Sequence, residues 1–411
     1  MLILDPAYTH RMMMERGNAA TVTGRDLDGF FDHVWTIHPL AGLVESDPLA
    51  RVGAPETHSL APRHTFIDGK IGRYRWPRLL APLNFLIAQA GIVRRALRIV
   101  RQERVDIIRS EEAWYCGLMA YLIARLSRRP LMIGVWGNPA EMRRSSGTPV
   151  MPRLFRKIWV EQLVERFVLR SADMVMVQNE DNRRFVLANN VPPERTAIFR
   201  LGNLLDRCHF ADPAERDPPI DELRALGIAA EDRMILCVSR LTPLKLVHHL
   251  VEMMGKLKDR QPRAKLLFLG DGPQRPELEQ RAGELGVGDR IVFGGNRDQQ
   301  WMARVVPEAA VVVSPLKGRA LAEAALGGAP IAAYDLDWHG ELIVSGETGE
   351  LVPARDIDAL TDAVDRLLAD PARARRLGDN VRRATLAMMD PDAVDEAQRQ
   401  IYAQVLAGHW R

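Results

Sequence analysis

Two basic residues in the second half of the chain could hold a phosphorylated ligand. Arg240 and Lys245 stand five residues apart, after the apolar run Met234–Ser239 and at the start of a helical segment. Two cations beside a helix N-terminus, with its unpaired amides and positive dipole end, form a good site for a diphosphate. Spacing alone leaves a second interpretation open, in which both are surface cations without a ligand.

An acid further along could complete such a site. The strand-like run Val311–Ser314 is followed by Gly318 and a helical stretch that contains Glu323, and Gly327-Gly328-Ala329-Pro330 ends it. An acid near the start of a helix often only compensates the helix dipole. A buried carboxylate could instead accept hydrogen bonds from two neighbouring hydroxyls of a ligand.

Glycine turns follow two other apolar runs. Gly270-Asp271-Gly272 comes after Leu266–Leu269, and Gly294-Gly295 comes after Arg290–Phe293. Glycine lets the backbone approach a ligand closely, although such a turn is also an ordinary connection from strand to helix.

The elements that position these residues alternate between short apolar runs and longer helical patterns. This order is typical of βαβ units and a parallel sheet, so we expect an α/β fold with two doubly wound domains. In such sheets, ligands bind beyond the carboxyl ends of the strands. The expected strands are 2–4, 33–37, 105–109, 131–136, 174–178 and 196–199 in the first half, and 234–239, 265–269, 290–293, 311–314, 331–334 and 350–352 in the second.

The domain boundaries follow from composition. Residues 210–223 are rich in proline and aspartate and read as a linker between domains at 1–209 and 224–388. Residues 389–411 are expected to form a C-terminal helix that crosses back to the first domain. Residues 1–210 carry a net charge of about +9 and the remainder about −6, within a total of +3.

Cysteine usage and hydropathy indicate the compartment. Cys116, Cys208 and Cys237 lie far apart, which argues against a disulfide framework and for a reducing environment. No signal peptide is apparent, and the apolar stretch 79–93 is too short and too polar to span a bilayer. We expect a cytoplasmic protein, at most peripheral on the inner face of the membrane.

The order of the motifs resembles a known family. SRLTPLK, FLGDGP, RIVFGG, SPLKGRALAEAALGGAPIAAYD and ELIVSGETGELVPA follow one another as in the donor-binding domain of retaining glycosyltransferases of the GT-B fold, family four. The stretches VDIIRSEEAWYCGLMAYLIARLSRRPLMIGVWGNP and ADMVMVQNEDNRRFVLANNVPPERTAIFRLGNLLDRCHF resemble units of its first domain. The resemblance spans roughly residues 100 to 385. It implies two Rossmann-like domains facing a central cleft, and transfer of a sugar from a UDP- or GDP-sugar to an acceptor hydroxyl with retention.

The resemblance also implies roles for individual residues. Arg240 and Lys245 match the pair that grips the diphosphate, and Glu323 matches the acid that holds the ribose hydroxyls. Gly318 precedes the helix whose amides meet the phosphate. The donor-binding residues expected on this basis are Gly270, Gly272, Phe293, Gly294, Asn296, Lys317, Gly318, Ala320 and Leu321.

Three positions depart from the family pattern. Pro315 stands where the first glutamate of a pair is usual, Leu246 replaces the glycine after the lysine, and Trp136 replaces a histidine offered to the transferred sugar. The nucleotide contacts are thus retained while the sugar contacts have changed. On the acceptor or sugar side we expect Trp136, Gly137, Asn138, Glu111 and Glu112.

Other ligands are less well supported. Asp-x-Asp spacing, as in Asp335 and Asp337, occurs four times and is mostly chance, so no metal and no other cofactor is expected. No nucleic-acid-binding module appears, and the second half is acidic. The basic segments 70–104 and 152–170 mix arginine with Trp, Phe and Leu as interfacial helices do. Packed helices with solvated arginines are the favoured interpretation. The alternative is peripheral membrane contact, which would imply a lipid-linked sugar or a glycolipid headgroup as the acceptor.

Two alternative functions stay open. One is another activity on the same fold, an epimerase or a phosphorylase. The other is an impaired homologue that binds a nucleotide sugar and serves as a partner subunit, because Pro315 and Trp136 replace groups usual in active enzymes. Turnover of a nucleotide sugar would exclude the second, and consumption of a free sugar phosphate would favour a phosphorylase.

Overall fold

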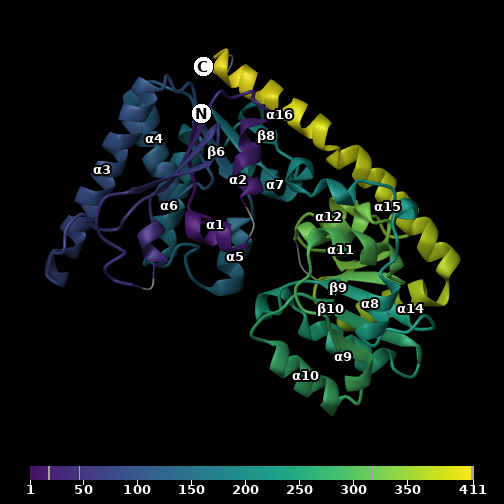
Figure 1. Cartoon of the computed structure of the whole chain (residues 1–411). Helices are drawn as coiled ribbons and strands as arrows, with labels where there is room; N and C mark the ends of the chain where they lie inside the picture. Colours follow the sequence, from purple (N-terminus) through teal and green to yellow (C-terminus); the bar gives the residue numbers. More distant parts are fainter. Residues whose placement is uncertain (17–18, 46, 316–317, 409–411) are drawn as a thin grey trace. The chain divides into compact units, whose positions relative to one another are not determined.

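The computed structural model of the chain describes residues 1–16, 19–45, 47–315 and 318–408. It divides into two compact units, Met1–Arg200 with Pro391–Arg411, and Leu201–Asp390 (Figure 1). No helix in these described ranges is long and apolar enough to cross a bilayer.

Unit 1 is built on an eight-stranded sheet with the order β3-β4-β2-β1-β5-β6-β7-β8. All pairings are parallel except that of β3 with β4. Its strands are β1 (Leu2–Leu4), β2 (Val34–His38), β3 (Glu56–Ala61), β4 (His64–Asp68), β5 (Ile108–Ser110), β6 (Leu131–Val135), β7 (Met174–Val177) and β8 (Thr196–Ile198). Its α-helices are α1 (His10–Arg16), α2 (Ala20–Thr23), α3 (Ala81–Gln102), α4 (Tyr115–Ser127), α5 (Pro139–Ser146), α6 (Ile158–Ser171), α7 (Glu180–Ala188) and α16 (Pro391–Leu406).

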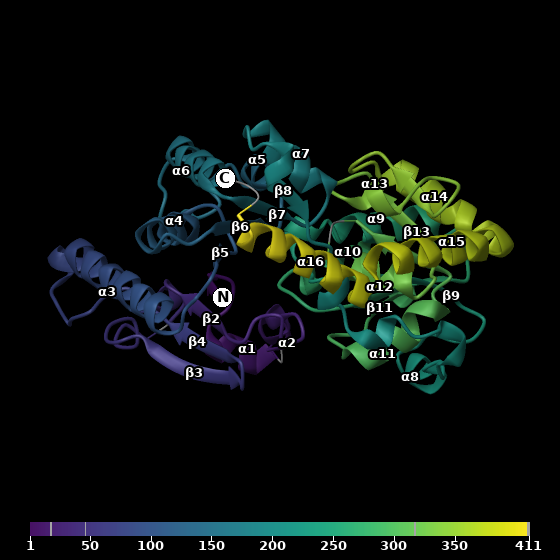
Figure 2. The same ribbon diagram turned by 90° about the horizontal axis from the view of Figure 1, so that it is seen from above.

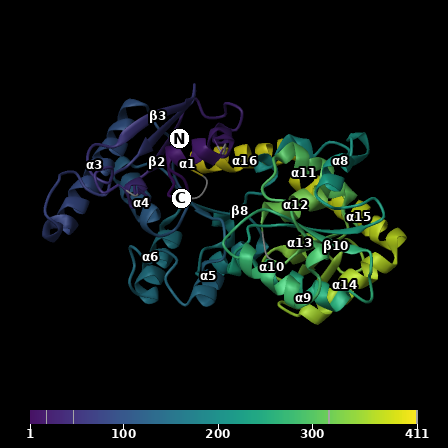
Figure 3. The same ribbon diagram turned by 60° about the horizontal axis from the view of Figure 1, so that its bottom comes forward.

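Alternate strand residues of unit 1 build two cores, one on each face of the sheet. Leu2, Ile108 and Ile133 pack under α3, α4, α6 and α7. On the other face, Ile3 and Met132 pack against Tyr402 of α16. In both views of Figures 2 and 3, α4 lies between α3 and α6 on the first of these faces. The side-chain period of two along each strand therefore produces the doubly wound arrangement.

Unit 2 has a six-stranded, all-parallel sheet with the order β11-β10-β9-β12-β13-β14. Its strands are β9 (Arg233–Val238), β10 (Ala264–Leu269), β11 (Ile291–Phe293), β12 (Val311–Ser314), β13 (Ile331–Tyr334) and β14 (Glu350–Val352). Its α-helices are α8 (Ile220–Ala225), α9 (His248–Leu257), α10 (Arg275–Glu284), α11 (Gln299–Val305), α12 (Arg319–Leu326), α13 (His339–Leu342), α14 (Ile357–Ala369) and α15 (Pro371–Met389).

Two stretches differ from the sequence expectation. The strands β3 and β4 were not predicted, because β3 is polar and largely exposed and lacks the apolar alternation of a half-buried strand. Residues 210–223, where the sequence suggested a linker, lie within unit 2. There Leu223 is buried in the core, and Arg216 donates a hydrogen bond to the Ala303 carbonyl at 2.6 Å.

Candidate active site

The Arg240 turn and the Gly270–Gly272 turn lie side by side at the carboxyl end of the unit 2 sheet. The Leu241 amide donates to the Asp271 carbonyl at 3.1 Å, and the Gln274 amide donates to the Leu241 carbonyl at 3.1 Å. A Cβ at Gly270 would overlap the Ser239 carbonyl, and one at Gly272 would overlap that of Leu241. The two glycines thus set the course of the Arg240 turn through backbone packing. Arg240 is exposed, and in the described chain its guanidinium has no ion pair.

Lys245 reaches the start of α12. It ends a 3-10 turn, Pro243–Lys245, and its Nζ lies 3.9 Å from the position that a Cβ at Gly318 would occupy. Gly318 precedes α12, whose N-terminus has no side-chain cap and no acid in its first turn. A cation and the uncapped amides of a helix therefore meet at one point, which is the arrangement that binds an anion.

Glu323 lies in the second turn of α12 and is only 5% exposed. In the ranges that the structure describes, its carboxylate accepts no hydrogen bond and makes no ion pair. Cys208 lies near it: burial and the carboxylates of Asp206 and Glu323 raise the pKa of that thiol to about 12. A carboxylate that accepts no donor from the protein can accept hydrogen bonds from the hydroxyls of a ligand.

Ala320 and Leu321 offer backbone rather than side chains. The Leu321 side chain is buried in the core, and its amide donates to the Gly318 carbonyl at 3.2 Å. Ala320 is half-buried on the same turn. Pro315 is buried at the end of β12, and Lys317, the residue expected to touch the sugar, lies outside the described residues.

Leu246 stands where the family pattern has a glycine, and its backbone adopts a conformation that glycine favours. Leu246 has φ 54° and ψ 25°, the left-handed conformation that glycine adopts readily. Its side chain packs against the core of unit 2. The packing offsets a backbone cost of roughly 1–2 kcal/mol.

The stretch expected to read the nucleobase lies at the edge of the sheet. The Phe293 ring stacks on that of Phe268 at 5.4 Å, with the Arg275 guanidinium 5.3 Å from its centre. The Gly294 amide donates to the Phe268 carbonyl at 2.9 Å, and its carbonyl accepts from Arg297 at 3.0 Å. Both backbone groups of Gly294 are thus already bonded. Asn296 is exposed beside them.

His339, the first residue of α13, is a buried histidine near the carboxyl end of β13. It is fully buried, its Nδ1 is 2.7 Å from the Tyr334 carbonyl, and its Nε2 has no hydrogen-bond partner in the described ranges. Burial lowers the pKa of His339, and Lys245 lowers it further. The described residues contain no group of three or more His, Cys, Asp or Glu able to hold a metal ion.

In unit 1, Glu111 and Trp136 contact each other. The Trp136 indole donates to a Glu111 carboxylate oxygen at 2.7 Å, and Arg109 pairs with Glu111 at 2.7 Å. Trp136 also folds back over β6, where a Cβ at Gly134 would lie 2.6 Å from the indole nitrogen. The two residues expected on the acceptor or sugar side are thus parts of one internal network.

Glu112 and Asn138 are engaged by the backbone. The Glu112 carboxylate accepts the amides of Trp114 and Cys116, and burial raises the pKa of Glu112 to about 7. Asn138 caps α5 by accepting from the Ala140 amide at 3.1 Å. Its Nδ2 also donates to Asp181 at 2.9 Å. Gly137 is half-buried between β6 and α5.

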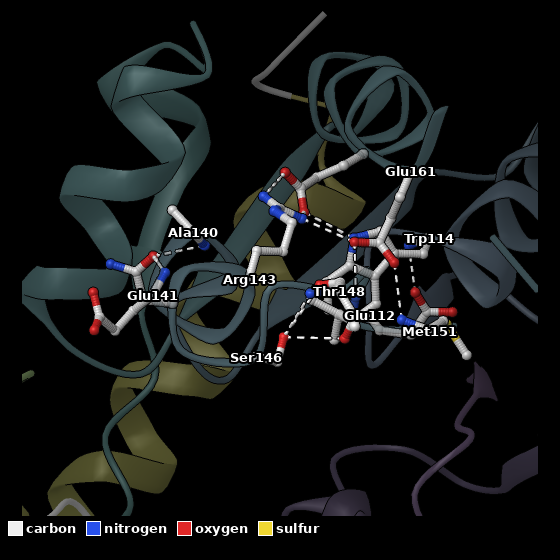
Figure 4. Close-up of polar contacts among 12 residues, drawn as sticks. Glu112, Trp114, Ala140, Glu141, Arg143, Ser146, Thr148, Met151 and Glu161 are labelled. Atoms are coloured by element: carbon white, nitrogen blue, oxygen red, sulfur yellow. Dashed lines mark hydrogen bonds and ion pairs between the residues drawn. The ribbon is translucent and has the colours of Figure 1, made fainter. Parts of the chain in front are cut away.

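A buried ion cluster beside these residues has no signature in the sequence. Arg143 of α5 binds Glu161 at 3.1 Å and Glu165 at 2.9 Å, and all three side chains are buried (Figure 4). The Trp114 indole donates to Glu165 at 2.8 Å. In a sequence, two buried acids one helical turn apart cannot be told from two exposed acids at the same spacing. Only their tertiary contact with Arg143 reveals the cluster.

Family comparisons cover most of the chain. Residues 31–202 match the glycosyl transferase 4-like domain, and residues 220–384 match the glycosyl transferases group 1. An alpha-D-kanosaminyltransferase of Streptomyces kanamyceticus is 27% identical over 294 residues, which are 69% of this chain and 73% of that protein. A GDP-mannose-dependent alpha-(1-6)-phosphatidylinositol monomannoside mannosyltransferase of Mycolicibacterium smegmatis is 26% identical over 323 residues, 76% of this chain and 80% of that protein.

Solved structures share the fold over nearly the full length. HepE of Anabaena, crystallised with UDP, has a TM-score of 0.72 at 17% identity and covers 98% of this chain and 99% of its own. Sucrose-phosphate synthase of Thermosynechococcus elongatus has a TM-score of 0.72 at 22% identity and covers 99% of both chains. The two family matches span most of the chain, and together with this fold they show that it belongs to the GT-B glycosyltransferases of group 1.

Proposed function

We propose that this glycosyltransferase moves a sugar from a UDP- or GDP-sugar to an acceptor hydroxyl with retention of anomeric configuration. The observation that carries the proposal is the meeting of Lys245 Nζ with the uncapped start of α12. In the second turn of that helix, the buried Glu323 carboxylate has no donor among the described residues. A diphosphate matches the positive charge of Lys245 and of the first amides of α12, and ribose hydroxyls match the acceptor oxygens of Glu323.

In this proposal Lys245, Arg240 and the first amides of α12 stabilise the negative charge that builds on the leaving diphosphate. Loss of one such preorganised donor typically costs about 3–4 kcal/mol of transition-state stabilisation. The departing phosphate oxygen takes the proton of the acceptor hydroxyl on the same face of the sugar, so that no separate strong base is needed. No metal is required, because the cations and helix amides carry the charge.

Names of related proteins support a nucleotide-sugar donor without choosing its base. The mannosyltransferase relative is named for GDP-mannose, and the HepE structures hold UDP or UDP-glucose. We propose an acceptor in glycolipid, surface polysaccharide or glycosylated-metabolite synthesis. The test is incubation with UDP- and GDP-hexoses and candidate acceptors, followed by NMR assignment of the new anomeric linkage. Inversion of configuration would refute the retaining mechanism.

One observation favours the impaired-homologue alternative. The Trp136 indole is bound to Glu111 and packed on Gly134, so the group that replaces the usual histidine is held inside unit 1. If every donor and acceptor pair gives no transfer while the nucleotide still binds, the chain acts as a nucleotide-sugar-binding partner subunit.

A further inference from the structure

Three neighbouring helices of unit 1 expose apolar side chains on their sides turned away from the sheet. Each helix presents a stripe at the spacing of one helical turn, and α4 lies between the other two (Figures 2 and 3). The exposed residues are Leu83 and Leu86 on α3 with Leu79 just before it, Leu118, Leu122 and Leu126 on α4, and Trp159, Leu163 and Phe167 on α6. We call the outward sides of α3, α4 and α6 the outer face.

The extent of exposure on this face is unusual for the molecule. Leu79 is 91% exposed and Trp159 is 62% exposed. In the described part of unit 2, by contrast, the exposed large apolar side chains come singly from separate segments: Leu204, Ile220, Leu244 and Val344. Scattered apolar residues need no explanation, whereas a contiguous patch marks an interaction surface.

The charges of the outer face are all positive. The only acids within α3, α4 and α6 are Glu161 and Glu165, and both are buried and bound by Arg143 (Figure 4). The exposed arginines are Arg94, Arg98 and Arg101 on α3, Arg125 on α4, and Arg166 and Arg170 on α6. In the residues that the structure describes, none of these six makes an ion pair.

Leucines occupy the first half and arginines the second half of a single stripe of α3. Leu83, Leu86, Arg94 and Arg101 lie within a narrow arc at the 3.6-residue period, opposite the buried Ile92 and Ala96. At the end of α4, Arg125, Arg128 and Arg129 line a hollow of about 400 Å³ together with Ser171 and Asp173. Asp173 accepts the Leu131 amide at 2.8 Å, and Asp106 lies 3.9 Å from Arg129.

We propose that the outer face docks on the surface of a bilayer that contains anionic phospholipids. Leucines and Trp159 enter the boundary between headgroups and acyl chains, while the six arginines contact lipid phosphates. Complementarity of charge selects this occupant. The three helices carry no exposed acid and six arginines without an ion pair in the described chain, so they attract an anionic layer rather than a second copy of themselves. A lipid-linked acceptor follows only if the proposed transferase function holds.

Vesicle sedimentation of the full-length protein, without any nucleotide, tests the docking separately from transferase activity. We expect binding to vesicles of phosphatidylcholine with phosphatidylglycerol, loss of binding at high salt, and little binding to phosphatidylcholine alone. The triple variant Arg94→Gln, Arg98→Gln and Arg125→Gln is expected to weaken binding roughly 100-fold, since each basic residue near such a surface contributes about 1 kcal/mol.

A matched control changes the same net charge elsewhere. Arg263→Gln, Arg375→Gln and Arg376→Gln remove three exposed arginines of unit 2 and are expected to leave vesicle binding within about twofold. Trp159→Gln with Leu163→Gln is expected to weaken binding, whereas Ile220→Gln is expected not to. Equal binding by the two arginine variants, or no binding of the native protein to anionic vesicles, would overturn the proposal. A dimer in the absence of lipid that Trp159→Gln dissociates would overturn it too, in favour of a protein interface.

Discussion

The Arg109 guanidinium donates a hydrogen bond to the Tyr402 phenolic oxygen at 2.5 Å, across 293 residues of sequence. The same guanidinium holds Glu111, and Glu111 accepts from the Trp136 indole. The C-terminal helix α16 is therefore joined through one chain of contacts to the loops that follow β5 and β6.

Tyr402→Phe removes this hydrogen bond and keeps the ring. The ring of the variant would retain the contacts that Tyr402 makes with Phe31, 4.9 Å between centroids, and Phe199, 5.8 Å. Because hydrogen bonds to charged groups contribute about 1.5–3 kcal/mol, we expect the free energy of unfolding to fall by that amount. Urea denaturation measures it. Tyr121→Phe, at a half-buried position of α4, serves as the control and is expected to change stability by less than about 0.5 kcal/mol. Equal effects of the two changes would contradict the role of Tyr402.

Removal of α16 is expected to destabilise unit 1. A chain that ends at Pro391 loses Tyr402 and Val405 from the core that also contains Ile3 and Met132. It also loses the bonds from Arg399 to the Leu27 carbonyl. We expect a fall in melting temperature of several degrees or failure to fold, because burial of each large apolar side chain contributes about 1.5–3 kcal/mol. A truncated protein that melts at the native temperature would refute the docking of α16 on unit 1.

Gly134→Ala tests the position of Trp136. A methyl group there would lie 2.6 Å from the indole nitrogen, so the ring must move and its bond to Glu111 must break. Overpacking of this kind costs about 1–3 kcal/mol of stability. Gly91→Ala is the matched control, because nothing lies within 4 Å of the new methyl group on α3, and alanine is expected to stabilise the helix by about 0.5–1 kcal/mol. Calorimetric melting of both variants measures these changes in stability. A Gly134→Ala variant as stable as the native protein would contradict the packing of Trp136 on Gly134.

Glu112 makes the stability of unit 1 depend on pH. Burial raises the pKa of Glu112 from 4.5 to about 7, so the folded protein keeps a proton that the unfolded chain has lost between these values. The free energy of unfolding should therefore fall as pH rises from about 4.5 to 7, by about 3 kcal/mol in total.

The variant Glu112→Gln isolates this contribution. Burial also raises the pKa of Asp68 to about 6, which makes stability fall with rising pH as Glu112 does. Burial lowers the pKa of His38 to about 4, which makes stability rise with pH. Because the native protein and the variant share the contributions of Asp68 and His38, these cancel in the difference between the two unfolding free energies. From pH 5 to pH 8 we expect the variant to become more stable relative to the native protein. A difference in unfolding free energy that does not change with pH would refute the role of Glu112.

Much of the fold was predictable, because buried parallel strands are short apolar runs. Four predicted strands match the observed bounds, and the other eight differ by one to three residues at their ends. The four are Leu2–Leu4, Val311–Ser314, Ile331–Tyr334 and Glu350–Val352. The polar strand β3 carries no such signal. Proline and aspartate in residues 210–223 predict a linker, whereas Leu223 is buried in the core of unit 2. Composition predicts that a stretch is irregular, but it does not predict whether that stretch packs against the core.

Roles within the candidate site were less accessible to the sequence. Lys245 and Gly318 are far apart in the chain, and they come close to each other because β9 and β12 are neighbours in the sheet. Glu111 and Glu112 are adjacent acids with the same sequence context. One binds Arg109 and Trp136, and the other accepts helix amides. Only the direction of each side chain separates these two roles.

Calorimetric titration with UDP and with GDP, each with and without EDTA, tests the central proposal most directly. We expect one of the two nucleotides to bind with the same affinity in both buffers. Lys245→Ala and Glu323→Gln should each weaken it about 10- to 100-fold, as loss of a charge-assisted bond does, while the exposed Glu231→Gln should not. Absence of binding to both nucleotides, or equal affinity of the native protein and the two site variants, would contradict the assignment of α12 and Lys245 as the diphosphate site.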